Sequence, residues 1–515
     1  MLFDEGFIEG MRRSTADALA AMQRLEEGAI ANSDEQRRVG HYWLRTPHLA
    51  PTEAIRADIE RAVQDIRSFV SAVHTGGTKP QIAQAFFVVL VIGIGGSSLG
   101  PQLLSDALGQ DDDPMILRFL DNTDPDGIDR VMADLEDLLP QTLTIVISKS
   151  GNTPETKNTM LEVAAAYERK GLSFARHAVA ATQPGSELHQ TALTDKWLRT
   201  FPIWDWVGGR TSITSSVGLL PAALQGVDIE AFLAGAADCD RITRNTEALR
   251  NPAMLTALMW HSAGEEQAKR NLVILPYRDR LLLLGRYLQQ LVMESLGKRR
   301  SRDGEEVLQG LTVYGNKGST DQHALVQQLV DGPDDFFVTF IEVLLDRSPG
   351  ASILVGPDLT TGDYLNAFLH ATRDVLTDRG RQSMTLTIGE LNARSLGSLI
   401  ALFERAVGLY AELIDVNAYH QPGVDLGKKT ADANLDLQRR VLGLLRGQIK
   451  PADANQPRLS AWTVEQIASA LNENERLETI FHILEHICAN PDHGVSHVAG
   501  STPVDARYGL GLHDR

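Results

Sequence analysis

The sequence predicts an α/β fold with two doubly wound parallel-sheet units, a helical N-terminal cap and a helical C-terminal extension. Two observations carry this prediction. Strand-like apolar runs alternate with helix-like segments, and this alternation occurs twice along the chain. Several of these runs are continuously apolar, as expected of strands that are buried on both faces of a sheet. The length of 515 residues is sufficient for about three domains.

Residues 1–75 are predicted to form the helical cap. The segments 15–30 and 51–73 place apolar residues at steps of three and four, which is the helical period. Pro51 and Thr52 favour a helix start at the second segment.

The first α/β unit is predicted at residues 76–250. Its expected strands are 86–92, 115–121, 143–150 and 176–183. Helices are expected at 127–139 and 154–170, and the segment 229–249 also has a helical pattern. The alternation predicts a parallel sheet with helices on its faces.

The second unit is predicted at residues 251–430, and the extension at 431–515. Strands are expected at 271–277, 311–316, 336–345 and 383–389, with helices at 281–297, 320–332 and 361–380. In the extension, 463–471 and 477–487 have helical patterns, and 447–460 has the composition of a linker.

Charge and cysteine content restrict the class of protein. The net charge of −18 argues against nucleic acid or an anionic membrane as the main partner. Cys239 and Cys488 lie far apart and lack a metal-binding spacing, which favours two free thiols in a reducing compartment. Because neither a signal-peptide pattern nor a membrane-length apolar run is visible, we expect a cytoplasmic protein.

A glycine-rich turn follows the first predicted strand. The stretch VIGIGGSSLG, residues 91–100, is typical of a loop that approaches phosphate closely. It is a near miss to the dinucleotide pattern G-x-G-x-x-G, because Ser98 occupies the position of the last glycine. With Asp121 as a possible ribose ligand, a dinucleotide-dependent oxidoreductase remains a weak alternative. The stretch DLGKKT lacks the spacing and order of a nucleotide P-loop.

A second polar turn, SKSGNTPET, follows the strand predicted at 143–150. It offers three hydroxyls and one positive charge, from Ser148, Ser150, Thr153 and Lys149. Pro154 suits the first turn of a helix, whose free amides add to an anion site. Such a site binds a phosphate monoester without a metal. An ordinary serine-rich helix cap is the alternative interpretation.

These two loops resemble the phosphosugar-binding loops of the sugar isomerase (SIS) domain. Four further stretches resemble the glucose-6-phosphate isomerase family: VGGRTSITSSVGLLP, LQQLVMESLGK, GNKGSTDQHALVQQL and YHQPGVDLGKKT. The six motifs occur in order between about residues 80 and 430. The resemblance implies two SIS-type αβα sandwiches in a homodimer. It also implies a glycolytic and gluconeogenic isomerase of glucose 6-phosphate and fructose 6-phosphate, without metal or cofactor.

The reaction of this family requires a base and a fixed positive charge. By resemblance, Glu294 moves the proton between C2 and C1, and Arg210 stabilises the cis-enediolate. Gln290 lies four residues before Glu294, so both are expected on one face of a helix. The apolar neighbours of Glu294 predict a partly buried carboxylate.

The resemblance also implies residues for ring opening and for binding. His323 would open the sugar ring with Lys428 assisting, and Glu155 would orient its imidazole. In the family this histidine comes from the neighbouring subunit. Gln421 would contact the sugar, and the phosphate would be held by Gly96, Ser97, Ser148, Lys149, Ser150 and Thr153.

Two features fall outside this pattern. The stretch HILEH, residues 482–486, matches a zinc-protease pattern, but its segment has the periodicity of an ordinary amphipathic helix. The residues after Lys428 match no isomerase motif, and we expect them to support packing or dimerisation. A non-catalytic sugar-phosphate sensor and an isomerase of a related phosphosugar remain alternatives.

Overall fold

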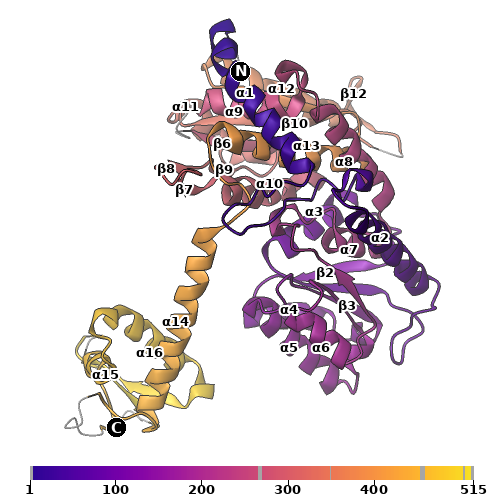
Figure 1. Ribbon diagram of the computed structural model, residues 1–515. Coiled ribbons are helices and arrows are strands. Elements are labelled where there is room, and N and C mark those ends of the chain that lie inside the picture. Colours follow the sequence, from indigo (N-terminus) through magenta and orange to yellow (C-terminus); the bar gives the residue numbers. More distant parts are fainter. Residues whose placement is uncertain (1–3, 265–269, 348–349, 453–458, 503–504, 512–515) are drawn as a thin grey trace. The chain divides into compact units, whose positions relative to one another are not determined.

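Both predicted parallel sheets are present in the computed structural model, which describes residues 4–264, 270–347, 350–452, 459–502 and 505–511 (Figure 1). The chain forms two compact units, Met1–His420 and Gln421–Arg515. Helix α14 (Pro422–Leu445) continues through residue 430, where the sequence analysis placed a boundary. The finer division into four parts stays a prediction.

The first sheet has five parallel strands in the order β2-β1-β3-β4-β5. They are β1 (Val88–Ile92), β2 (Ile116–Leu120), β3 (Thr142–Ile147), β4 (Ala178–Thr182) and β5 (Arg199–Pro202). The first four strands confirm the prediction. Strand β5 was not predicted, because a four-residue edge strand that contains arginine and proline has no apolar run.

The second sheet is parallel and has the order β13-β10-β6-β9. Its strands are β6 (Asn271–Pro276), β9 (Val313–Tyr314), β10 (Phe336–Val343) and β13 (Ser383–Ile388). If the strands of each sheet are numbered in chain order, the first sheet begins with the order 2-1-3-4. The second sheet, read from β9 to β13, has the same order. The order therefore reverses beside the first strand in each sheet, as in doubly wound folds.

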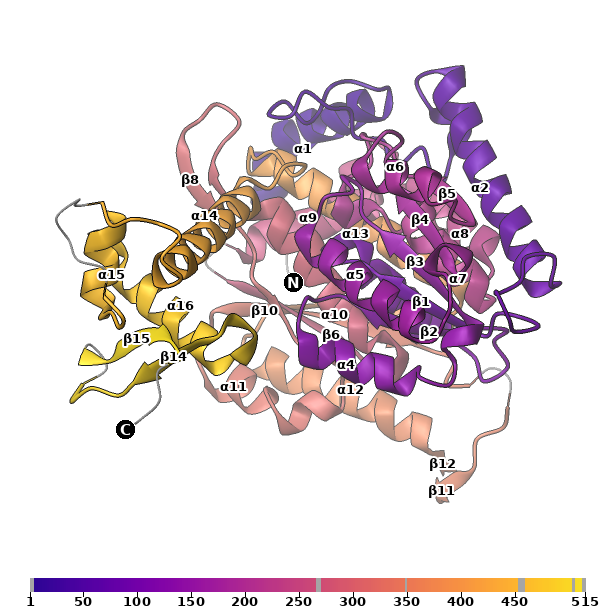
Figure 2. The same ribbon diagram turned by 90° about the horizontal axis from the view of Figure 1, so that it is seen from below.

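Alternate residues of the strands pack into different cores. Val88, Leu90 and Ile92 of β1 pack with α4 (Pro125–Asp134), α5 (Pro154–Arg169) and α6 (Glu187–Thr194) (Figure 2). Val89 and Val91 belong instead to the largest core, with α3 (Leu99–Leu108) and α7 (Ser216–Gln225). This core also includes residues of β6, so it extends from one sheet to the other.

The predicted cap contains two long helices with side-chain N-caps. Asp4 caps α1 (Glu5–Glu26), and Thr52 caps α2 (Glu53–His74). Helix α1 packs on α13 (Ala393–Leu413), which also contacts α8 (Ile229–Thr243) and α9 (Pro252–Ala263). This unit also contains α10 (Leu282–Leu288), α11 (Val326–Asp331) and α12 (Thr361–Asp378). Two hairpins, β7–β8 (Lys298–Arg300, Glu306–Gln309) and β11–β12 (Leu354–Gly356, Leu359–Thr360), belong to it as well.

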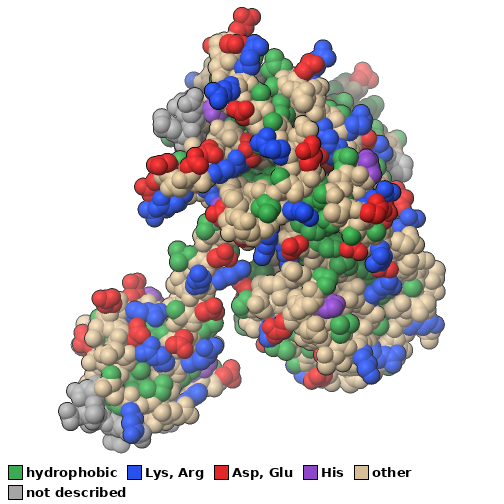
Figure 3. Space-filling view, viewed as in Figure 1, with side chains coloured by type: hydrophobic (Ala, Val, Ile, Leu, Met, Phe, Trp, Pro, Cys, Tyr) green, Lys and Arg blue, Asp and Glu red, His purple; other side chains and the backbone are tan. Residues whose placement is uncertain are grey.

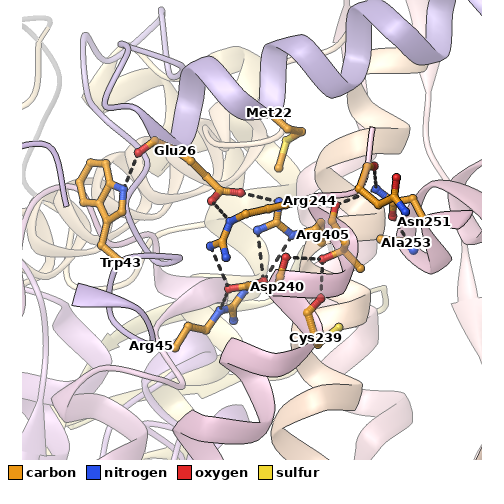
Figure 4. A network of polar contacts seen from close by, with 12 residues as sticks. Met22, Glu26, Trp43, Arg45, Cys239, Asp240, Arg244, Asn251, Ala253 and Arg405 are labelled. Atoms are coloured by element: carbon orange, nitrogen blue, oxygen red, sulfur yellow. Dashed lines mark hydrogen bonds and ion pairs between the residues drawn. The ribbon is translucent and has the colours of Figure 1, made fainter. Parts of the chain in front are cut away.

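A network of buried charges lies where α8 and α13 meet the segment after α1 (Figure 4). The carboxylate of Asp240 accepts from Arg45 at 2.6 Å and lies 3.2 Å from Arg405. Arg45 also contacts Glu404 at 2.5 Å. Burial alone would raise the pKa of Asp240, but the charges of Arg45 and Arg405 outweigh it and lower that pKa.

The second unit contains the two predicted helices, α15 (Val464–Leu471) and α16 (Leu477–Ala489). It also contains an antiparallel pair that was not predicted, β14 (Val495–Val498) and β15 (Arg507–Leu510). The predicted linker 447–460 is only partly visible, since residues 453–458 lie outside the described residues.

The zinc-protease pattern lies on α16 and is part of its packing. Glu485 accepts a hydrogen bond from Tyr508 at 2.8 Å, and the exposed His482 lies 4.0 Å from Glu478. Within the described ranges, no group of three or more His, Cys, Asp or Glu side chains could hold a metal ion.

Acidic and basic side chains are intermingled on the face seen in Figure 3, despite the net charge of −18. Burial raises the thiol pKa of Cys239 and of Cys488 to about 11. None of the described helices is long and apolar enough to cross a membrane.

Candidate active site

The two loops singled out in the sequence lie at the point where the order of the first sheet reverses. Strand β1 lies between β2 and β3, so the chain leaves β1 and β3 at neighbouring positions on the same edge. The loop after β1 contains the short helix η2 (Gly95–Ser97), and the loop after β3 leads to α5. Ligands of doubly wound sheets bind at such a point.

The loop after β1 makes close backbone contact with the loop of Arg210. A Cβ atom on Gly96 would lie 2.1 Å from the carbonyl oxygen of Gly209. The hydroxyl of Ser212 donates to the carbonyl of Gly96 at 3.3 Å. On the other side, a Cβ atom on Gly95 would lie 3.1 Å from Nε2 of Gln290. Three of the six motifs therefore meet at this loop.

Replacing Gly96 by alanine is expected to destabilise the protein by roughly 1–3 kcal/mol, because the added methyl group overlaps the backbone of Gly209. The free energy of unfolding in urea would measure this. Gly209→Ala is the matched control, since its Cβ atom would meet nothing within 4 Å. Equal stability of the two variants would contradict the close contact.

The loop after β3 uses several of its polar groups internally. The hydroxyls of Ser148 and Thr153 lie 3.1 Å apart, and both line a cavity of only about 30 Å³. Nζ of Lys149 donates to the carbonyls of Asp205 at 2.7 Å and Val207 at 2.8 Å. Lys149 thus joins this loop to the one that carries Arg210. Its pKa is lowered to about 8, mainly by burial and then by Arg37.

Two hydroxyls remain open to a ligand in these loops. Ser97 is half-buried and Ser150 is exposed. Ser98 is buried instead, and accepts a hydrogen bond from Gln102. The same amide of Gln102 donates to the carboxylate of Asp121 at 2.8 Å. This is the carboxylate that would bind a ribose in the dinucleotide alternative, and it already has a partner within the protein.

Arg210 and Glu294 lie together although their motifs are far apart in the chain. Nε of Arg210 is 3.6 Å from Oε2 of Glu294. The guanidinium is almost fully buried and donates to the carbonyls of Ala418 and His420, both at 3.1 Å. Burial lowers the pKa of Arg210, and the charge of Glu294 opposes this shift. The guanidinium is therefore held in place by main-chain groups.

Glu294 ends a π-helical segment, η8 (Gln289–Glu294), which continues α10. Single π-helical turns of this kind are frequent at functional sites. The side chain of Glu294 is 22% exposed, so the carboxylate is partly buried, as predicted. Gln290 belongs to the same segment, and its contact with Gly95 places it beside the loop after β1.

Lys298 is a neighbour of this site that the sequence analysis did not identify. It is buried, and its Nζ donates to the carbonyls of Glu294 at 2.8 Å and Ser295 at 2.7 Å. Its pKa is lowered to about 7, first by burial and then by Arg210. The spacing of four residues from Glu294 is the signal that could have drawn attention to it.

The residues predicted for ring opening lie on elements other than η8, which carries Glu294. The exposed His323 ends η9 (Thr320–His323), and its side chain makes no hydrogen bond or ion pair with another described residue. Oε2 of Glu155, in the first turn of α5, is buried and has no hydrogen-bond partner among the described residues. Gln421 and the exposed Lys428 lie at the start of α14, in the second unit. The roles of all the predicted site residues stay predictions.

Comparison with known proteins assigns the chain to a family. The phosphoglucose isomerase family model matches residues 11–349 and 369–440. A glucose-6-phosphate isomerase of Geobacter sulfurreducens is 56% identical over 509 residues, which cover 99% of this chain and 94% of that protein. A glucose-6-phosphate isomerase of Synechococcus sp. (strain JA-3-3Ab) is 55% identical, over 95% of this chain and 90% of that protein.

A solved structure agrees with these sequence matches. The crystal structure of a glucose-6-phosphate isomerase from Chlamydia trachomatis has a TM-score of 0.75 and 28% identity. The match covers 87% of this chain and 90% of that one. The family model, the sequence relatives and this structure agree over most of the chain, and the residues that the family model matches include all six motifs. The chain belongs to the phosphoglucose isomerase family.

Proposed function

We propose that this protein interconverts glucose 6-phosphate and fructose 6-phosphate, as a cytoplasmic enzyme of glycolysis and gluconeogenesis. The family supplies the reaction class, and the observation that carries the proposal is the pair of Glu294 and a buried Arg210. A carboxylate and a fixed cation side by side are what proton transfer next to a carbonyl requires. The pair lies beside the loop after β1, where a phosphosugar would be bound.

Proton transfer is assigned to Glu294. After ring opening, its carboxylate removes the proton from C2, which leaves a cis-enediolate, and then returns that proton to C1. The hydroxyl proton of O2 moves to O1 in the same conversion, so that the aldose becomes the ketose. The 3.6 Å between Arg210 Nε and Glu294 Oε2 exceeds hydrogen-bond length, so the carboxylate is not locked to the guanidinium.

Arg210 stabilises the enediolate. Its Nη1 and Nη2 are held by main-chain carbonyls, so its charge is in place before the oxyanion forms. Stabilisation by a group that does not have to reorganise is worth more than the same charge on a mobile side chain.

Ring opening is assigned to His323 of a second subunit, with Lys428 assisting and Glu155 orienting the imidazole. Oε2 of Glu155 lacks a hydrogen-bond partner among the described residues, so this oxygen is not committed to another group. A carboxylate next to an imidazole orients it and stabilises its charged form. Ser97, Ser150 and main-chain amides of the two loops hold the phosphate, and Gln421 contacts the sugar. The proposal thus includes a homodimer with shared active sites.

Turnover of fructose 6-phosphate tests the proposed function. The full chain is expected to form glucose 6-phosphate with a kcat of about 1–10³ s⁻¹, measured by coupling to glucose-6-phosphate dehydrogenase. Turnover of another ketose phosphate alone would favour the related-isomerase alternative. Binding of fructose 6-phosphate without turnover would favour the sensor.

Mixing two inactive variants tests the shared site. Glu294→Gln and His323→Ala subunits, refolded together in equal amounts, are expected to recover about one quarter of wild-type activity, because half of the dimers carry one intact site of two. Each variant refolded alone is the control. If activity does not rise above the sum of the two controls although mixed dimers form, each site is built from one chain.

A further inference from the structure

The main-chain groups that hold Arg210 belong to a turn, residues 417–420, which follows α13. Its second and fourth carbonyls accept from the guanidinium, both at 3.1 Å. The first carbonyl accepts from Nδ1 of His420 at 3.2 Å, and the third accepts from Nδ2 of Asn32 at 3.2 Å. All four carbonyls of the turn are thus matched by side-chain donors. The position of Arg210 therefore depends on what fixes this turn.

Asn417 begins the turn, and its buried amide group is matched on both sides. The Oδ1 atom accepts from the main-chain amide of Tyr419 at 2.9 Å, so the side chain closes the turn on itself. The Nδ2 atom donates to Oδ1 of Asn32 at 3.0 Å and to Oδ2 of Asp34 at 2.5 Å. An amide with both its donor and its acceptor atoms engaged is fixed in one orientation.

The partners of Asn417 come from a second turn, residues 32–37, which follows α1. The main chains of Asn32 and Arg37 exchange two hydrogen bonds at 3.1 Å, which close this turn. The hydrogen bond from Asn417 lowers the pKa of Asp34, so this carboxylate accepts in its charged form. Hydrogen bonds to a charged acceptor are stronger than those between neutral groups. The turn 32–37 is therefore a firm support for Asn417.

These contacts join the N-terminal cap to the guanidinium of Arg210. Asn32 and Asn417 are 385 residues apart in the chain, and the side chain of Arg210 is only 6% exposed. A shift of the turn 417–420 would move both carbonyls that hold the guanidinium. Misplacement of a catalytic group by about 1 Å can cost up to about 10²-fold in rate. The hydrogen bonds of Asn417 thus bear on the chemistry from outside the site.

We propose that Asn417 is a positioning residue for Arg210. It fixes the turn 417–420, and the carbonyls of this turn hold the guanidinium where the enediolate forms. Asn32 and Asp34 support Asn417 from the cap. The inference rests on the proposed role of Arg210 in isomerisation, and it requires that the loss of Asn417 affects turnover only through Arg210.

A double-mutant cycle tests this requirement. Arg210→Met is expected to lower kcat by about 10²- to 10³-fold. Asn417→Ala is expected to lower kcat by about 10- to 10²-fold with KM changed less than about threefold, because the charge of Arg210 acts on the enediolate. The double variant should turn over within about threefold of Arg210→Met alone, since no guanidinium is left to position. The coupled assay gives kcat per folded site, counted by binding of sorbitol 6-phosphate.

Asn251→Ala is the matched control for the loss of a buried asparagine. Nδ2 of Asn251 also donates to two carbonyls, and its Oδ1 caps α9, away from the predicted site residues. This variant should be less stable than the wild type, but its kcat per folded site should be unchanged. A structural effect of Asn417→Ala would give the same result as this control.

Three outcomes decide the proposal. A kcat of Asn417→Ala within about twofold of the wild type would overturn it, as would a double variant that loses the product of the two single losses. Near-normal turnover of Arg210→Met would remove Arg210 from the proposed chemistry, and this inference with it. If Asn417→Ala does not fold, Asp34→Ala replaces it under the same criteria, with an expected loss of about three- to tenfold, because Asp34 is 53% exposed.

Discussion

The Glu294→Gln variant is expected to lose about 10³- to 10⁴-fold in kcat, because glutamine has nearly the shape of glutamate but cannot accept the C2 proton. The backbone of residue 294 would stay in place, since Lys298 holds its carbonyl at 2.8 Å. Arg210 would also stay, because its two main-chain acceptors are unaffected. The loss should therefore appear in the chemical step alone.

Substrate binding separates this result from a general disruption of the site. The dissociation constant of sorbitol 6-phosphate, which cannot isomerise, should change less than about threefold in Glu294→Gln, since a neutral isostere leaves the phosphate loops intact. Glu306→Gln is the control for the substitution itself, because Glu306 is 53% exposed and, within the described part of the chain, forms an ion pair with Arg299 alone. A kcat within tenfold of wild type would remove Glu294 as the base.

The sheets could be predicted because their strands are locally distinctive. Residues 88–92 and 142–147 are buried throughout, and the sequence shows this as uninterrupted apolar runs. Strands β5, β7, β8, β14 and β15 lack such runs, since they are short and partly exposed. Such strands form because they pair with a neighbouring strand, and a local sequence pattern does not show which segments will pair.

The site was predictable as a set of motifs but not as an arrangement. Glu294 and Arg210 come from separate motifs, and only the fold shows that their side chains are 3.6 Å apart. The carbonyls of Ala418 and His420 that hold Arg210 have no sequence signature, because every residue carries a carbonyl. Lys149 was predicted to bind phosphate, yet its ammonium group joins two loops through main-chain acceptors.

The buried charge network is expected to govern the stability of the first unit. Asp240→Asn should lower the free energy of unfolding by about 3–5 kcal/mol, because removing one partner leaves buried charge uncompensated. Asp240 is fully buried and interacts with both Arg45 and Arg405. After the substitution these guanidiniums would retain only Glu404 and Glu26, respectively, as close carboxylates.

Urea unfolding followed by tryptophan fluorescence reports mainly on the first unit, because five of the six tryptophans lie there and only Trp462 lies in the second unit. Asp238→Asn is the matched control on the same helix, because its pairs with Arg241 and Arg394 are exposed and should contribute no more than about 1 kcal/mol. A loss below about 1 kcal/mol in Asp240→Asn would mean that Arg45 and Arg405 regain compensation from water.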